Sequence, residues 1–290
     1  MSNSDQIQRI LFDNLDIRGV LVGLEETYQD VLALHEYPAA IRNALGEMLA
    51  AVSLLSTTLK FEGRLLLQAQ GSGNVRALMA EINHRRECRA IARYEGDILE
   101  GAGIIDLIGE GHLVITIEPE VGSRYQGIVP LEKPTLSECL TEYFMQSEQL
   151  PTQIHLAADE KSAAGFLLQV MPAAGTGSED WEHIAVLGST LKPEELLSLD
   201  NETLLFRLFH QEECRLYPAD DLTFKCDCSR ERSANALQFM TQEELLEMLE
   251  EQGVIDVACQ FCNAHYRFDE TDIGAMFSAT AHAPKSDQIH

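Results

Sequence analysis

The sequence predicts an α+β fold, in which a mixed N-terminal domain is followed by a helical segment and a small C-terminal domain. Three observations predict this organisation. A long apolar helical pattern follows Pro38, strand-like segments bounded by turn residues come after it, and four of the seven cysteines lie in two close pairs near the C-terminus. Since 45% of the 290 residues are hydrophobic, the chain can form a core, and its length favours two domains.

Two helices are predicted in the N-terminal domain. The first begins after Pro38, and its apolar residues cover more than one face, so we expect it to be buried. These residues are Ile41, Leu45, Met48, Leu49, Val52 and Leu55. The second helix begins at the capping box Thr135-Leu136-Ser137-Glu138 and should end before Pro151.

Five segments of the N-terminal domain are predicted to be strands: residues 64–70, 112–118, 124–131, 153–157 and 165–171. The first ends at Gly71-Ser72-Gly73-Asn74, which is typical of a turn, and the second and third flank Pro119 and Gly122 as the arms of a hairpin do. Because hairpins pair antiparallel strands, these segments and the helices together give the α+β class.

Small and turn-forming residues at positions 172–178 predict a domain boundary. We expect a core domain at residues 1–173, a metastable amphipathic linker at 174–225 and a C-terminal domain at 226–290. The linker contains two short helical patterns, one starting at Pro193 and one with the apolar stripe Leu204, Leu205, Leu208 and Phe209. Isolated helices shorter than about 12–15 residues are marginal in water. The linker should therefore pack against another part of the chain, which we expect to be the C-terminal domain.

The formal net charge of −26 excludes some classes of partner. Clustered Lys and Arg bind nucleic acid and anionic membrane surfaces, so neither partner is expected. Residues 1–173 carry 24 acidic and 13 basic residues, residues 174–225 carry 11 and 4, and residues 226–290 carry 12 and 4. The excess of acidic over basic residues is denser on the C-terminal side of residue 173. Self-repulsion there weakens compact states, so something other than packing should hold this part of the chain folded.

No targeting segment is predicted. The first thirty residues contain several acidic residues, no unbroken apolar core and thus no signal-peptide pattern, and no stretch is apolar over the roughly 20 residues that a bilayer requires. We expect a cytoplasmic protein, whose thiols are reduced, metal-bound or redox-active.

The two cysteine pairs, Cys226-Asp227-Cys228 and Cys259-Gln260-Phe261-Cys262, have the spacing of a structural zinc site. Four thiolates suit tetrahedral Zn²⁺, and four protein ligands leave no open position for a catalytic water. His265 could replace one thiolate, but closed four-cysteine sites are the commoner design. We therefore expect one Zn²⁺ per chain, held by Cys226, Cys228, Cys259 and Cys262.

The residues around the cysteine pairs predict local structure. Thr241-Gln242-Glu243-Glu244 is a second capping box, and its helix should end at Gly253. Asn263 suits a left-handed turn after the second pair, and residues 265–268 alternate as a short strand does. Three cations near the first pair are expected to offset the charge of a zinc–tetrathiolate centre: Lys225, Arg230 and Arg232.

Oxidation would change such a site if each pair closed into a local disulfide. Zinc binding contributes about 10–16 kcal/mol to the folding of zinc-finger peptides. A disulfide stabilises a fold more when it closes a longer loop, and a bond within either pair closes a very short one. Local disulfides would replace a tether across the thirty residues between the pairs, so the C-terminal domain should unfold and the linker should lose its neighbour. The sequence thus predicts a redox switch.

Two alternatives remain open. A thiol–disulfide oxidoreductase could use Cys259 and Cys262, although that chemistry favours a CxxC at a helix N-terminus and this pair precedes a predicted strand. A constitutive protein-binding module could hold its zinc as a purely structural ion and would keep the metal under oxidant. The remaining cysteines, Cys88, Cys139 and Cys214, are expected to be inert.

At these residues the chain resembles the redox-regulated 33 kDa chaperonin family of bacterial heat-shock holdases. The specific part is the cysteine pattern, Cys226-x-Cys228-Ser229-Arg230-Glu231-Arg232 and then Cys259-x-x-Cys262 with Tyr266 and Phe268. Further motifs extend the resemblance over nearly the whole chain: Thr58-Leu59-Lys60-Phe61-Glu62-Gly63, Arg124-Tyr125-Gln126-Gly127, Tyr143-Phe144-Met145-x-Ser147-Glu148-Gln149-Leu150-Pro151-Thr152 and Leu168-Gln169-Val170-Met171-Pro172.

The resemblance implies an ATP-independent molecular chaperone that is not an enzyme and is inactive while reduced and zinc-bound. It implies that oxidants form the disulfides Cys226–Cys228 and Cys259–Cys262, that zinc is released and that the linker unfolds. The oxidised form would expose a client-binding surface, form a homodimer and hold unfolding client proteins under oxidative stress.

Overall fold

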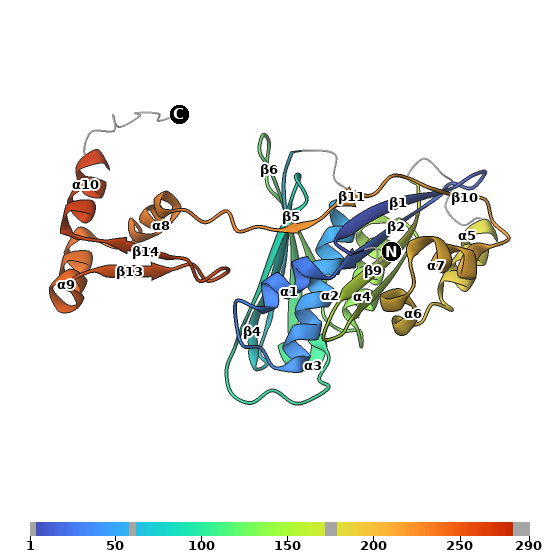
Figure 1. Ribbon diagram of the computed structural model, residues 1–290, viewed down its shortest axis with the longest axis horizontal. Helices are drawn as coiled ribbons and strands as arrows, with labels where there is room; N and C mark the ends of the chain where they lie inside the picture. The colour runs from blue at the N-terminus through green and yellow to red at the C-terminus, as the bar shows by residue number, and fades with distance from the viewer. Residues whose placement is uncertain (1–3, 58–61, 172–178, 281–290) are drawn as a thin grey trace. The chain divides into compact units, whose positions relative to one another are not determined.

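The computed structural model describes residues 4–57, 62–171 and 179–280, and it divides the chain into two compact units (Figure 1). The first unit ends at Lys225 and the second begins at Cys226. Helices and antiparallel sheets make up the first unit, so the predicted α+β class is confirmed.

One sheet of the first unit has the strand order β10-β1-β2-β9-β8, and β11 also pairs with β1. All of its strand pairs are antiparallel. The strands are β1 (Gln6–Phe12), β2 (Ile17–Leu24), β8 (Thr152–Ala158), β9 (Ala163–Val170), β10 (Cys214–Leu216) and β11 (Asp220–Asp221). Strand β9 is buried along its whole length, because Leu167 belongs to the core on one side of the sheet and Phe166 and Leu168 belong to the core on the other.

The second sheet has the order β12-β5-β4-β3-β6-β7. Its strands are β3 (Gly63–Gly71), β4 (Val75–Asn83), β5 (Glu87–Tyr94), β6 (Gly111–Pro119), β7 (Tyr125–Pro130) and β12 (Thr223–Phe224). Only the β12–β5 pair is parallel. The predicted hairpin is confirmed as β6–β7, in which Ile115 lies opposite Gly127.

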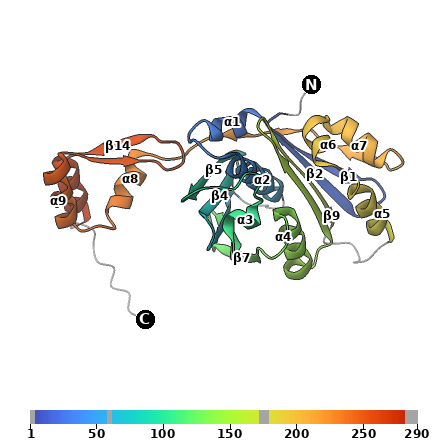
Figure 2. The same ribbon diagram turned by 90° about the horizontal axis from the view of Figure 1, so that it is seen from below.

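Helix α2 (Ala39–Ser56) contacts both sheets and lies between them (Figures 1 and 2). Its apolar residues are buried, as the pattern after Pro38 predicts. The approach to the first sheet is close at Gly46, where a Cβ atom would lie 2.6 Å from the Cβ of Ala158. A side chain at this position would push the helix away from the sheet.

The other helices of the first 171 residues are short: α1 (Glu26–Leu32), α3 (Ile104–Ile108) and α4 (Leu136–Tyr143). The predicted capping box of α4 is present, since the amide of Glu138 donates to the Thr135 hydroxyl and the amide of Thr135 donates to the Glu138 carboxylate, each at 3.2 Å. A single π-helical turn, η1 (Phe144–Glu148), extends α4 and ends before Pro151, as predicted.

The described part of the predicted linker, residues 179–225, belongs to the first unit. Helices α5 (Glu179–Gly188), α6 (Pro193–Ser198) and α7 (Asn201–Phe209) lie on the face of the first sheet that is turned away from α2 (Figure 2). The predicted stripe of α7 packs there with Phe12, Phe166 and Leu168. Our expectation that the C-terminal domain supports the linker is therefore wrong. The apolar stripe faces the first sheet, a surface that the local pattern does not reveal.

The last part of the linker runs along both sheets. Strands β10 and β11 extend the first sheet at β1, and β12 extends the second sheet at β5. Leu222, between β11 and β12, is buried in the core that contains α2. The segment is thus attached to the first unit at three short strands and one buried side chain.

The second unit contains α8 (Arg230–Leu237), α9 (Gln242–Gln252), α10 (Glu270–Thr280) and the hairpin of β13 (Ile255–Ala258) and β14 (His265–Phe268). The predicted capping box at Thr241 is present, and Gly253 ends α9 with φ +76°. The core is small, and its buried members are Leu237, Leu245, Leu249, Ile255, Phe268 and Ile273. Domains of this size commonly need a metal ion or disulfides to fold.

Two features singled out in the sequence lie outside the described residues: the boundary segment 172–178 and positions 58–61 of the first family motif. Along the chain, the boundary between the two compact units falls between Lys225 and Cys226, where the third predicted domain begins. That residues 174–225 form a distinct, metastable linker stays a prediction.

Candidate metal centre

The first cysteine pair lies in irregular chain between Lys225 and α8. Ser229 caps the start of α8, and its hydroxyl accepts a hydrogen bond from the amide of Arg232 at 3.1 Å. This cap fixes the start of the helix immediately after Cys228.

The second cysteine pair lies at the turn of the β13–β14 hairpin. The amide of Cys259 donates to the carbonyl of Ala264, and the amide of Asn263 donates to the carbonyl of Cys259, both at 2.8 Å. Asn263 has φ +55°, so the left-handed turn predicted at this residue is confirmed.

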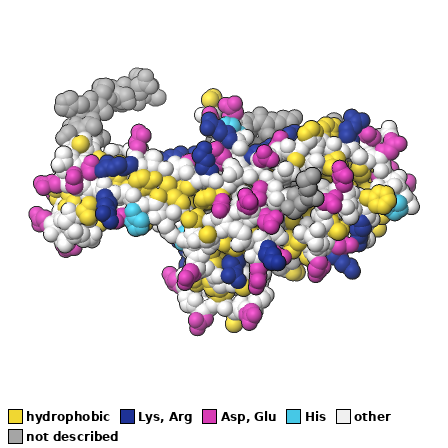
Figure 3. All heavy atoms as spheres, viewed as in Figure 1, with side chains coloured by type: hydrophobic (Ala, Val, Ile, Leu, Met, Phe, Trp, Pro, Cys, Tyr) yellow, Lys and Arg dark blue, Asp and Glu magenta, His cyan; other side chains and the backbone are white. Residues whose placement is uncertain are grey.

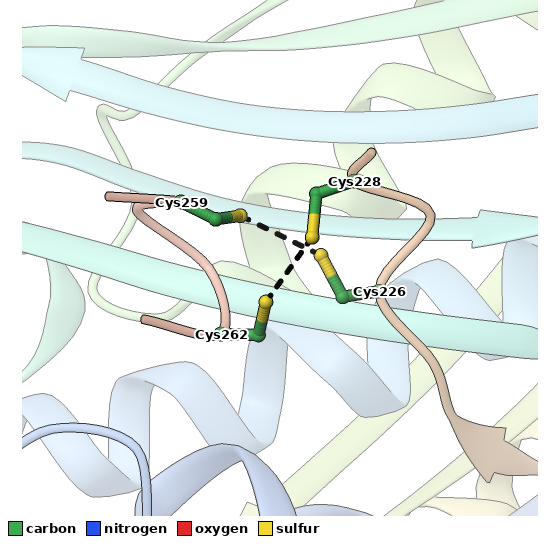
Figure 4. Close-up of side chains that lie close together, drawn as sticks. All are labelled: Cys226, Cys228, Cys259 and Cys262. Atoms are coloured by element: carbon green, nitrogen blue, oxygen red, sulfur yellow. Dashed lines mark hydrogen bonds between the residues drawn. The ribbon is translucent and has the colours of Figure 1, made fainter. Parts of the chain in front are cut away.

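The side chains of the two pairs point toward one another (Figure 4). The four sulfur atoms all lie within 4.8 Å of one another. The distance from Cys228 to Cys262 is 3.3 Å and that from Cys226 to Cys259 is 3.7 Å, so both short contacts join one pair to the other. In a tetrahedral site with Zn–S bonds of about 2.3 Å, the sulfurs are about 3.8 Å apart. The cluster therefore fits one tetrahedral metal ion, and its soft donor set suits zinc.

His265, the alternative ligand, lies outside this cluster. Its Nδ1 is 2.8 Å from the carboxylate of Asp256, and its side chain is 60% exposed. The geometry thus favours the four-cysteine set that the spacing predicts.

Hydrogen bonds to the sulfurs affect the charge that each can carry. Burial opposes ionisation of Cys259, but the amides of Cys262 and Phe261 donate to its sulfur, and the net effect lowers its pKa. Burial raises the pKa of Cys262, and the neighbouring thiols raise it further. Four ionised thiols at this separation repel one another, so a bound cation is what allows all four to be thiolates.

The three cations near the first pair contact carboxylates. Lys225 Nζ lies 2.5 Å from Glu87, Arg230 lies 2.7 Å from Asp272, and Arg232 pairs with Asp227. Each cation thus has an acidic partner, and the expectation that these cations offset the charge of the thiolates stays a prediction.

The remaining cysteines are placed as expected for inert thiols. Cys88 and Cys139 are buried, and Cys214 is half-buried in β10. Burial raises the pKa of Cys88 and that of Cys214 to about 12, and it also raises the pKa of Cys139. A thiol with a raised pKa supplies little thiolate near neutral pH and reacts slowly.

One residue of the cluster was not predicted as such. The hydroxyl of Tyr266 lies 3.2 Å from the sulfur of Cys228. The sequence singles out Tyr266 only through the family motif. Its alternation with buried Phe268, two residues later on the same face of β14, was the local signal that could have placed it toward the interior.

Comparison of the sequence with known families gives one match over nearly the whole chain. A family model described as "Hsp33 protein" matches residues 5–269. Among curated relatives, the 33 kDa chaperonin of Shewanella loihica is 50% identical over 285 residues, which cover 98% of this chain and 99% of that protein. The 33 kDa chaperonin of Shewanella frigidimarina is 49% identical over 286 residues, covering 99% and 100%.

A solved structure has the same fold. The crystal structure of the 33 kDa chaperonin of Thermotoga maritima matches with a TM-score of 0.84 and 23% identity, covering 96% of this chain and 100% of that one. At 23% identity, this structural similarity supports a shared fold and nothing more. Among the described helices, none is long and apolar enough to cross a bilayer.

Proposed function

Because the chain belongs to the Hsp33 family of chaperones, we propose that it is a redox-regulated, ATP-independent holdase that resides in the cytoplasm. The reduced form would hold one Zn²⁺ through Cys226, Cys228, Cys259 and Cys262 and would be inactive. The oxidised form would bind unfolding client proteins as a homodimer. The observation that carries the proposal is the convergence of four half-buried sulfurs from two distant pairs.

A bound metal ion would cross-link the two ends of the segment between the cysteine pairs. The chain from residue 229 to residue 258 contains α8, α9 and β13, and its apolar core is small. The four thiolates hold both ends of this segment at one point, which would contribute a large part of the folding free energy, as zinc does in zinc-finger peptides.

The proposed switch is the oxidation of each pair within itself. Two thiolates, one molecule of hydrogen peroxide and two protons give one disulfide and two molecules of water, so each pair loses two electrons to one peroxide. Cys226–Cys228 and Cys259–Cys262 disulfides would remove all four thiolate ligands. They would also close only very short loops, so they would not replace the lost cross-link.

The consequence for the first unit follows from the attachment of its last segment. Strand β12 ends at Phe224, and Lys225, whose amide donates to the carbonyl of Cys88 at 3.1 Å, is followed directly by Cys226. We propose that unfolding beyond Cys226 loosens this end of the segment. Release of residues 179–225 would then uncover apolar side chains of the first sheet, among them Phe12, Leu21 and Phe166, for unfolded clients.

The arrangement of the sulfurs makes the pairing a sharp test. Both short sulfur–sulfur contacts run between the pairs. Oxidation that simply joined these nearest sulfurs would form Cys226–Cys259 or Cys228–Cys262 disulfides. Such bonds would keep the two ends of the segment between the cysteine pairs joined and would leave the second unit folded. The proposal therefore requires that peptide mapping of the peroxide-treated full chain yields the two within-pair disulfides.

The experiment compares the parent with a Cys88→Ser control, which removes a buried thiol outside the cluster. Both proteins should release zinc on oxidation, form the within-pair disulfides and then suppress the light scattering of a heat-denatured model enzyme. Between-pair disulfides, or equal suppression by the reduced zinc-loaded form, would contradict the proposal. Retention of zinc under oxidant would favour the constitutive binding module, and catalytic turnover in an insulin-reduction assay would favour the oxidoreductase.

A further inference from the structure

The hydroxyl group of Tyr266 is directed at the cysteine cluster. Its oxygen lies 3.2 Å from the sulfur of Cys228, which in turn lies 3.3 Å from the sulfur of Cys262. A thiolate sulfur has no proton to donate. When Cys228 is ionised, as a metal ligand must be, the hydrogen bond therefore runs from the Tyr266 O–H to the sulfur.

The surrounding structure fixes the position of this hydroxyl. Tyr266 lies opposite Val257 in the β13–β14 hairpin, and its ring packs against the core of the second unit. Phe268, two residues later on the same face, is fully buried. A tyrosine held by strand pairing and ring packing has little freedom to turn its hydroxyl away from Cys228.

Backbone amides also donate to the sulfurs. The amides of Cys262 and Phe261 donate to Cys259, and the amide of Ala264 donates to Cys262. These donors belong to the turn itself and are the same for any side chain at those positions. Tyr266 is a side-chain donor, so its contribution depends on the identity of one residue and can be removed by substitution.

We propose that Tyr266 is a positioning residue of the metal centre, whose O–H donates to the Cys228 sulfur, holds it in the cluster and slows its oxidation. The physical reason is that a hydrogen bond withdraws electron density from the sulfur lone pairs. Those lone pairs bind the metal and also attack the oxygen of a peroxide, and nucleophilicity falls as their density falls. The role of this residue in setting the threshold of the switch rests on the proposed function, whereas its effect on the sulfur does not.

The test uses the reduced full-length chain loaded with Co²⁺, whose thiolate charge-transfer bands report the electron density on sulfur. In Tyr266→Phe, which keeps the ring, the charge-transfer band should move to longer wavelength while the tetrahedral ligand-field bands remain. In the zinc-loaded form, peroxide should release the metal about three to ten times faster than in the parent. The matched control, Tyr217→Phe, removes the hydroxyl of a tyrosine in the first unit and should leave both readouts unchanged.

A second substitution keeps the inference testable if Tyr266→Phe fails to fold. Incorporation of 3-fluorotyrosine at position 266 keeps the shape of the side chain and strengthens the donor, so the band should move to shorter wavelength and metal release should slow. Identical spectra and release rates in the parent and both variants would overturn the inference. Shifts of the same sign in both variants would also overturn it, since they would reflect packing. Neither readout involves client binding, so failure of the holdase proposal would be seen separately.

Discussion

One hydrogen bond, between Tyr266 and Cys228, links the β13–β14 hairpin to the chain that precedes α8. The short spacing of each cysteine pair predicts a metal-binding turn, and the left-handed conformation of Asn263 follows from its side chain. The contact of Tyr266 with Cys228 depends on the register of a hairpin and on the path of a chain 38 residues away. Register and chain path are not contained in local spacing, so this partner could not be predicted.

Glu47 supplies a prediction at the same scale. Its carboxyl lies in buried helix α2, and burial raises its pKa to about 7. Between its ordinary pKa of 4.5 and about pH 7, the unfolded chain ionises this group while the folded chain keeps it protonated, so its contribution to stability falls as pH rises through that range. Above about pH 7 both states are ionised, and the full free-energy cost of burying the Glu47 carboxylate remains.

We expect Glu47→Gln to stabilise the reduced protein at pH 8 by up to about 3 kcal/mol relative to the parent. Within this range, the difference in unfolding free energy between variant and parent should be smallest near pH 4.5. There the folded chain keeps Glu47 protonated and the unfolded chain is only about half ionised at this residue. Urea unfolding across this pH range checks the prediction. A difference between the two proteins that does not change with pH would contradict it.

At the scale of secondary structure, elements with end signals were predicted well. The capping boxes at Thr135 and Thr241 locate the starts of α4 and α9. Strand β2 was not predicted, because it is buried on both faces and contains Gly19 and Gly23, which weaken a strand pattern. The packing at Gly19 is tight, since a Cβ would lie 3.2 Å from the carbonyl oxygen of Leu167 in the neighbouring strand. Such a tertiary reason is invisible in the local sequence.

Helix α7 illustrates the same limit and permits a direct test. Its stripe was predicted to be amphipathic, but its partner was misassigned, since any apolar surface would satisfy the pattern. Phe209 is 2% exposed and lies edge-on to Phe12, with ring centroids 5.1 Å apart. Phe206, on the same helix, is 72% exposed.

Phe209→Ala should destabilise the packing of residues 179–225 by about 3–5 kcal/mol, as truncation of a buried aromatic does. Phe206→Ala, with the same change in composition, is expected to have an effect below about 1 kcal/mol. Hydrogen exchange of the amides in α5, α6 and α7 of the reduced protein measures the loss of stability in both variants. If these helices hold the protein inactive, Phe209→Ala should also protect clients without oxidant. Equal exchange in the two variants would contradict the assignment of the first sheet as their support.

At the scale of the whole molecule, the net charge of −26 acquires a second interpretation. On the face shown in Figure 3, acidic side chains are spread over both units rather than gathered in one patch. The excess is densest in the segments behind residue 173, which are those proposed to unfold. High negative charge would keep an unfolded form with exposed apolar surface soluble.

Neutralising exposed acids of α9 tests this interpretation. The triple change Glu247→Gln, Glu250→Gln and Glu251→Gln removes one exposed negative charge from the middle of the helix and two from its last turn. Negative charges in the last turn are unfavourable, so the reduced form should lose no stability. The oxidised form should aggregate at several-fold lower protein concentration than the parent. The control changes three exposed acids of the first unit, Asp97→Asn, Glu100→Gln and Glu110→Gln, and should aggregate less than the α9 variant. Equal aggregation of both triple variants and the parent would remove the proposed role of charge.

The central claim is that within-pair oxidation of the four-cysteine cluster converts an inactive chain into a holdase. The most direct measurement titrates the reduced, zinc-loaded protein with peroxide and follows metal release and suppression of client light scattering in the same samples. We predict that client protection is absent at the start, rises as zinc is released and follows the appearance of Cys226–Cys228 and Cys259–Cys262 disulfides. Full protection before zinc is released, or complete zinc release with no protection at any stage, would contradict the account.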